Sequence, residues 1–138
     1  MTTRGAAPKA GAAPGAANVT IQVFGRHDDQ GTRAALRFFK ERRITPHVVD
    51  LSRKPMAAGE LRRFVERLGA QALADQGGRL WKDAGLGFLT MTDDALAERL
   101  LANQRLLRLP LVRAGNRFTA GRDEDGWRAI VAEALSSG

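Results

Sequence analysis

The stretch from Val19 to Leu51 constrains the fold most strongly, because it predicts a strand, a helix and a second strand in close succession. Apolar residues at every second position, from Val19 to Val23, indicate the first strand. Beyond Thr32, the predicted N-cap, apolar residues recur at helical spacing. The apolar pair Val48 and Val49 then indicates the second strand. Two strands joined by one helix over so short a span are expected to be parallel, with a right-handed crossover.

The remainder of the chain predicts further helices and a terminal hairpin. A helix over 57–68 ends at Gly69, a residue type favoured after a helix, and Thr92 is the predicted N-cap of a helix with an acidic first turn. A short helix is expected around Arg79–Ala84, and a hairpin turn at Ala114–Asn116. The residues expected to face inward are Leu61, Phe64, Val65 and Leu68, then Trp81, then Leu96, Leu100 and Leu101, and in a last helix over about 124–135 Trp127, Ile130, Val131 and Leu135.

The domain organisation follows from composition along the chain. Residues 1–18 are mostly Ala, Gly and Pro and predict a disordered tail, whereas 19–138 predict one folded domain. No apolar run approaches the ~18 residues that a membrane span requires. Because the N-terminus also lacks a hydrophobic signal region, a cytoplasmic location is expected.

The absence of cysteine is the firmest limit on chemistry. The 138 residues include no cysteine, which excludes thiolate catalysis, disulfide exchange and a redox switch built on the chain's own sulfur. The two histidines, His27 and His47, are not spaced as a metal pair and are interpreted as surface residues. No metal or resident cofactor is therefore expected from the residues.

The formal net charge of +7 permits binding to anionic partners without requiring it. The sequence carries no RNP-like aromatic motif, zinc finger or Gly-rich phosphate loop. A solvated basic surface is therefore favoured over a specific nucleic-acid site.

The order of motifs resembles the arsenate reductase (ArsC-like) and Spx-like branch of the thioredoxin fold over about residues 19–133. A polar loop leads to Thr32-Arg33, Asp50-Leu51 ends the second strand, and Leu109-Pro110 precedes the hairpin. Two further motifs, Trp81 with Ala84-Gly85-Leu86 and the helix ending in Leu68-Gly69, fall in the same order. The resemblance implies a glutaredoxin-like βαβ…ββα core, with a helical insertion between the βαβ unit and the C-terminal hairpin. It also implies a cis peptide bond between Leu109 and Pro110.

The resemblance also locates the site and shows that it is degenerate. The family's nucleophilic cysteine corresponds to Asp29, while Thr32 and Arg33 match the last two positions of its motif. The arginine usually found before the cis proline corresponds to Leu109. Two further family arginines fall near Asp75 and Ala120, and Arg108 is expected to point to the opposite side of the chain from Leu109. Arsenate reduction is therefore not expected, and Asp28 with Asp29 is interpreted as a solvated loop rather than a catalytic carboxylate pair.

Two classes of function remain. The resemblance to Spx-like regulators favours a pseudoenzyme that acts as a protein-binding or regulatory adaptor, with RNA polymerase as a partner implied by resemblance alone. Two helix faces are candidate docking surfaces for an acidic partner, although both also fit a solvated face. The alternative is a family oxidoreductase or glutathione-binding protein, which would use the groove between the Arg26–Thr32 loop and Pro110 and take its thiol from the ligand. The residues of the two helix faces are Arg33, Arg37 and Lys40, and Arg62, Arg63 and Arg67.

Overall fold

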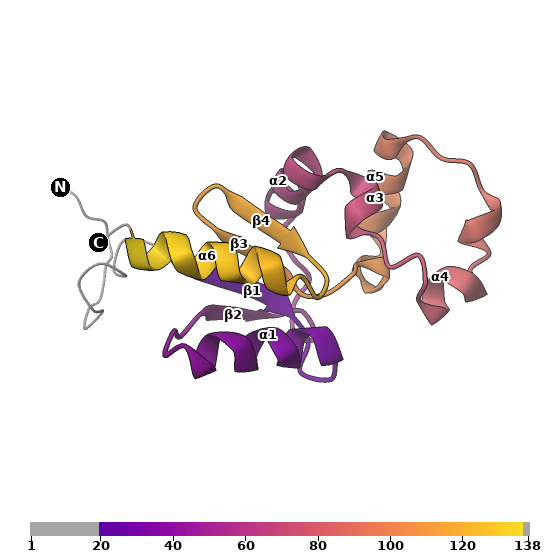
Figure 1. Ribbon diagram of the computed structural model, residues 1–138. Coiled ribbons are helices and arrows are strands. Elements are labelled where there is room, and N and C mark those ends of the chain that lie inside the picture. Colours follow the sequence, from indigo (N-terminus) through magenta and orange to yellow (C-terminus); the bar gives the residue numbers. More distant parts are fainter. Residues whose placement is uncertain (1–19, 137–138) are drawn as a thin grey trace.

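The computed structural model describes residues 20–136, so the predicted tail and Val19 lie outside the described residues. The fold is a mixed α/β domain built on one four-stranded sheet (Figure 1). The elements are β1 (Ile21–Gly25), α1 (Gln30–Glu41), β2 (His47–Asp50), α2 (Ala58–Leu68), α3 (Ala70–Leu73), α4 (Arg79–Asp83), the 3₁₀ turn η1 (Leu86–Phe88), α5 (Asp93–Ala102), the 3₁₀ turn η2 (Gln104–Leu106), β3 (Leu111–Ala114), β4 (Arg117–Ala120) and α6 (Glu124–Ser136).

The sheet has the strand order β2-β1-β3-β4. Strands β1 and β2 are parallel, with Val23 opposite Val48, which confirms the predicted βαβ unit. Strand β3 runs antiparallel to both β1 and β4, and β4 returns from it as the predicted hairpin. This is a thioredoxin-like arrangement, as the sequence implied.

Alternation along the strands divides the core between the two faces of the sheet. On one face, Val23 and Val112 pack with α1 and α6, where Phe39 and Trp127 are fully buried. On the other face, Phe24 meets Phe64 of α2 edge to face, with ring centroids 5.8 Å apart. Buried rings on both faces therefore hold the helices in two layers around the sheet.

The helical insertion between β2 and β3 extends away from the sheet, with α4 at its far end (Figure 1). Helix α2 anchors it through an ion pair between Glu60 and Arg113 of β3, at 2.6 Å. The return to the sheet is held by a single antiparallel bridge between Ala74 and Leu107, next to which the Arg108 amide donates to the Leu73 carbonyl at 2.7 Å. These bonds fix the segment just before Pro110.

Several local predictions are confirmed and two are wrong. The Leu109–Pro110 bond is cis, Thr92 caps α5, and Gly69 is the C-cap of α2. Thr32 is not the N-cap of α1, because the helix begins earlier and Asp29 caps it. In the last helix Leu135 is 64% exposed, and Ala134 is buried instead. No helix within residues 20–136 is long and apolar enough to cross a membrane.

Candidate functional site

The start of α1 lies directly against the cis proline. A Cβ added to Gly31 would lie 2.7 Å from the Leu109 carbonyl oxygen and 3.2 Å from Cδ of Pro110. Only a bare Cα fits so close to another backbone segment. The same point lies 3.3 Å from Oδ2 of Asp29, so the Asp29 carboxylate is close to Leu109 and Pro110.

Asp29 is held as the cap of α1 by two hydrogen bonds from Thr32. Its Oδ2 accepts from the Thr32 amide at 2.7 Å and from the Thr32 hydroxyl at 2.8 Å. The Thr32 side chain is buried, and its Oγ1 also accepts from the Arg26 amide at 3.3 Å. Gly25 makes room for this network, since a Cβ there would lie 2.3 Å from Thr32 Oγ1. The loop and the first turn of α1 are thus tied together.

This arrangement changes what the helix N-terminus can bind. The first amides of a helix and its dipole attract a negative charge, and here the carboxylate of Asp29 already supplies one. A small oxyanion placed at the same point would meet a fixed negative charge and would find the Thr32 amide already bonded. The start of α1 is therefore a self-capped end.

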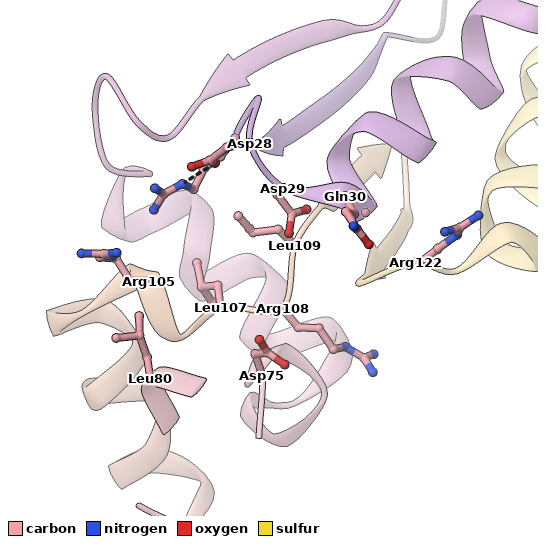
Figure 2. A pocket seen from close by; sticks show the side chains of 12 residues that line it. Asp28, Asp29, Gln30, Asp75, Leu80, Arg105, Leu107, Arg108, Leu109 and Arg122 are labelled. Atoms are coloured by element: carbon pink, nitrogen blue, oxygen red, sulfur yellow. Dashed lines mark hydrogen bonds and ion pairs between the residues drawn. The ribbon is translucent and has the colours of Figure 1, made fainter. Parts of the chain in front are cut away.

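A hollow of about 440 Å³ opens beside this end of α1, between the Arg26–Gly31 loop and the segment before Pro110 (Figure 2). We call it the cis-proline groove. Asp29 and Leu109 both line it, whereas Arg33 does not, because its guanidinium donates to the His27 carbonyl at 2.8 Å. The lining residues are Arg26, Asp28, Asp29, Gln30, Gly31, Asp75, Leu80, Arg105, Leu107, Arg108, Leu109 and Arg122.

Arg108 also lines the groove, although its side chain was expected to point to the opposite side of the chain from Leu109. Its side chain lies across Gly121, where an added Cβ would be 2.7 Å from the guanidinium Nε. Its Nη2 donates to the Ala120 carbonyl at 3.2 Å. Arg108 and Leu109 do leave the chain in different directions, but the groove is broad enough to include both (Figure 2).

Three further arginines of the groove were not singled out from the sequence as site residues. Arg26 directly follows β1, Arg105 lies in η2, and Arg122 lies in the turn after β4. The segment around Arg105 and Arg108 does contain a sequence signal, namely the apolar pair Leu106 and Leu107 between the two arginines. Both leucines are buried in the structure. The sequence contains no signal that Arg26 and Arg122 lie in the same groove, because that depends on the folding of distant segments.

The two predicted docking faces differ in how free their cations are. On α1, Arg37 and Lys40 are exposed and Arg33 is bonded to the loop. On α2, Arg62 lies 3.5 Å from Glu98, while Arg67 donates to the Asn116 carbonyl at 2.7 Å and Arg63 is exposed. Internal contacts therefore engage one of the three named cations on α1 and two of the three on α2.

The histidines and carboxylates do not gather into a metal site anywhere in the described residues. His27 Nε2 lies 3.6 Å from Asp50, and His47 is exposed on β2. The pKa of Asp50 is lowered, chiefly because the Ser52 hydroxyl and amide donate to its carboxylate. Asp50 therefore steadies the turn after β2.

The fold and the site together define a thioredoxin-like protein with a carboxylate at the start of α1. A model of the ArsC family matches residues 16–130, and the chain belongs to that family. An arsenate reductase of Neisseria meningitidis serogroup B is 28% identical over 114 residues, which cover 80% of this chain and 97% of that protein. The uncharacterized protein YfgD of Escherichia coli K12 is 30% identical, covering 80% of this chain and 96% of that protein.

Solved structures show the same fold. An arsenate reductase from Vibrio cholerae superimposes with a TM-score of 0.69 at 21% identity, covering 81% of this chain and 98% of that one. A putative ArsC family related protein from Bacteroides fragilis gives a TM-score of 0.72 at 17% identity, covering 80% and 97%. At these identities the likeness concerns the fold alone.

Proposed function

We propose that this ArsC-family protein is a non-catalytic binding protein, an adaptor of the cytoplasm, and not an arsenate reductase. The observation that carries the proposal is the carboxylate of Asp29 at the start of α1, which is bonded to Thr32 and lines the same groove as Leu109. The carboxylate of Asp29 is engaged in the hydrogen bonds that cap the helix. It stands where the family's sulfur nucleophile is expected.

The chemistry of arsenate reduction has no starting point in this chain. The reaction needs a thiolate that attacks the oxyanion, a free helix N-terminus that stabilises the charge, and arginines beside it. No cysteine exists in the sequence, and Leu109 stands where an arginine was expected. Residues that act as a unit cannot be replaced by the survivors once the nucleophile is gone.

Binding, by contrast, needs only a shaped and charged surface. The cis-proline groove has a volume within the range of about 300–1,000 Å³ that ligand sites commonly have. Four arginines and two leucines are among the lining residues: Arg26, Arg105, Arg108, Arg122, Leu107 and Leu109. These features support a site that recognises a partner, of which RNA polymerase is one class suggested by the Spx-like resemblance.

A second candidate function is glutathione binding, with the thiol supplied by the ligand. The groove lies between the Arg26–Gly31 loop and Leu109, where this alternative places it, and its arginines match the two carboxylates of glutathione. In this case the protein would assist chemistry on the ligand's sulfur while contributing no nucleophile.

Turnover assays test the proposal directly. Purified protein is incubated with arsenate, or with a low-molecular-weight disulfide, in the presence of glutathione and a reductase couple. We expect no turnover above that of the buffer. Turnover that is lost in both Asp29→Asn and Thr32→Val would overturn the proposal, because it would make the helix cap part of an active site.

A glutathione titration followed by NMR separates the two candidates. Amide shifts that cluster at Gly31, Leu109 and Arg108 and saturate with glutathione would favour the second candidate. Unchanged amide chemical shifts at these positions would favour the adaptor function, in which a protein segment occupies the groove.

A further inference from the structure

The groove carries cations at both ends and carboxylates in its centre, and this arrangement selects a class of ligand (Figure 2). We infer that it binds an extended, acidic peptide segment of a partner protein, with acidic side chains at both ends and a short uncharged middle. The inference rests on the proposed binding function. It differs from the surfaces predicted on the faces of α1 and α2.

One end of the groove is formed by Arg26 and Arg105. Arg26 is held by Asp28, with Nε 3.3 Å from the carboxylate. The guanidinium of Arg105 makes no hydrogen bond or ion pair with any of the described residues, and it lies at the edge of the groove opposite Arg122 (Figure 2). Arg105 is therefore available to an outside carboxylate.

The other end is formed by Arg108 and Arg122. One guanidinium nitrogen of Arg108 donates to the Ala120 carbonyl, and this hydrogen bond orients the guanidinium. The remaining N–H groups of Arg108 are left for a ligand. The bare Cα of Gly121, under the Arg108 side chain, makes this position possible. Arg122 follows Gly121 directly and, among the described residues, has only an exposed ion pair with Glu124, at 3.4 Å. Both arginines lie on the same side of the groove (Figure 2), so this end presents two positive charges to a ligand.

The centre of the groove excludes competing anions. Asp29 and Asp75 lie there with Leu107 and Leu109, and no cation among the described residues lies within ion-pair distance of Asp75. A continuous polyanion such as single-stranded nucleic acid would place phosphates against these carboxylates, and the lining contains no aromatic ring on which a base could stack. A peptide can instead separate its acidic side chains by residues that rest on the leucines.

The helix faces are weaker candidates for the same partner. Arg37 and Arg63 are exposed on convex helices, and in the described structure they contact no acidic residue. Cations on such surfaces are screened by salt and yield little binding energy unless a concave site excludes water. Because their side chains are free, however, they make a charge-matched control.

The test compares two double variants that each remove two positive charges. Binding of a short fluorescein-labelled peptide, with glutamates at both ends and a few Gly and Ala residues between them, is followed by anisotropy. We expect Arg105→Gln with Arg108→Gln to weaken binding about tenfold. Arg37→Gln with Arg63→Gln should leave it nearly unchanged, and Arg105→Gln alone, which removes no internal contact, should act in the same direction as the double variant.

A second pair tests the central carboxylate in the opposite direction. Asp75→Asn should tighten peptide binding by about threefold, because it removes a negative charge from the groove. Glu66→Gln changes the net charge equally on the exposed side of α2 and should have no effect. Urea unfolding of each variant shows that it remains folded.

Several outcomes would overturn the inference. Equal weakening by the two double variants would mean that only the overall positive field attracts the peptide. A single-stranded oligonucleotide or glutathione that displaces the peptide at lower concentration than the unlabelled peptide itself would assign the groove to that ligand. These failures leave the absence of arsenate turnover untouched, so they are distinguishable from a failure of the proposed function.

Discussion

The two sides of the cis-proline groove differ in how their polar groups are satisfied. On the α1 side, Asp29, Thr32 and the Arg26 amide bond to one another and close the helix start. On the opposite side, Arg105 makes no side-chain bond within the described residues, and Arg108 is only partly used. A closed side and an open side face each other across Leu109.

This difference separates two properties of the fold. Catalysis depends on a free anion site at the start of α1, and that site is filled by the chain's own carboxylate. Ligand binding depends on cations presented by segments on the other side, and these remain available. The two sides of the groove therefore differ in whether their polar groups are free to meet a ligand.

The largest effect is expected on the closed side, from Thr32→Val. Valine keeps the shape of threonine but removes the hydroxyl, so the Arg26 amide and one Asp29 oxygen each lose a partner beside a buried side chain. The free energy of unfolding should fall by about 2 kcal/mol. Urea denaturation measures the change, and Thr45→Val at an exposed position should stay within about 0.5 kcal/mol. Equal stability of the two variants would mean that the network does not hold the closed side together.

A smaller effect is expected from Asp29→Ala. Loss of the cap should cost about 1 kcal/mol, while Asp29→Asn should retain most of the stability because its side-chain oxygen still accepts from the Thr32 amide. Acidic-peptide binding should be kept or strengthened in both variants, because the change removes a negative charge from the groove. If either variant lost peptide binding, the closed side would be part of the binding surface and the comparison would fail.

The smallest effect concerns the acid stability of the turn that borders the closed side. The pKa of Asp50 is lowered from its ordinary value of 3.8, mainly by the hydrogen bonds from Ser52 and to a smaller extent by the charges of His27 and Arg53. A carboxyl group with a lowered folded pKa stabilises the fold above its unfolded pKa, and this stability is lost as the pH falls through the folded pKa. The stability difference between the wild type and Asp50→Asn should therefore shrink from about pH 6 to about pH 2 in urea titrations. A constant difference would show that Asp50 acts without titrating.

Much of the fold could be predicted from local patterns. The period of two in β1, the helical spacing in α1 and the glycine after α2 each depend on neighbouring residues only, and the structure confirms all three. The prediction of the N-cap of α1 was wrong because two residues near the helix start are both suited to cap it. Asp29 and Thr32 can both cap a helix, and the added turn from Gln30 packs Gly31 against the Leu109 carbonyl, a contact that no local pattern contains.

The candidate site shows the same limit more clearly. The position of Asp29 beside a cis Pro110 could be predicted, because the family resemblance supplies both landmarks. The partners of the groove could not, since Arg26, Arg105, Arg108 and Arg122 belong to separate segments and their neighbourhood depends on how the insertion returns to the sheet.

By itself, the amino-acid sequence determined the βαβ unit and the absence of any thiol in the 138 residues. These properties depend on residue type and on spacing along one segment. Only the tertiary structure decided which carboxylate closes the start of α1 and which arginines face the groove. The reason is that a bridge between Ala74 and Leu107 and the bare Cα of Gly121 orient Arg108, and such contacts join residues far apart in the chain.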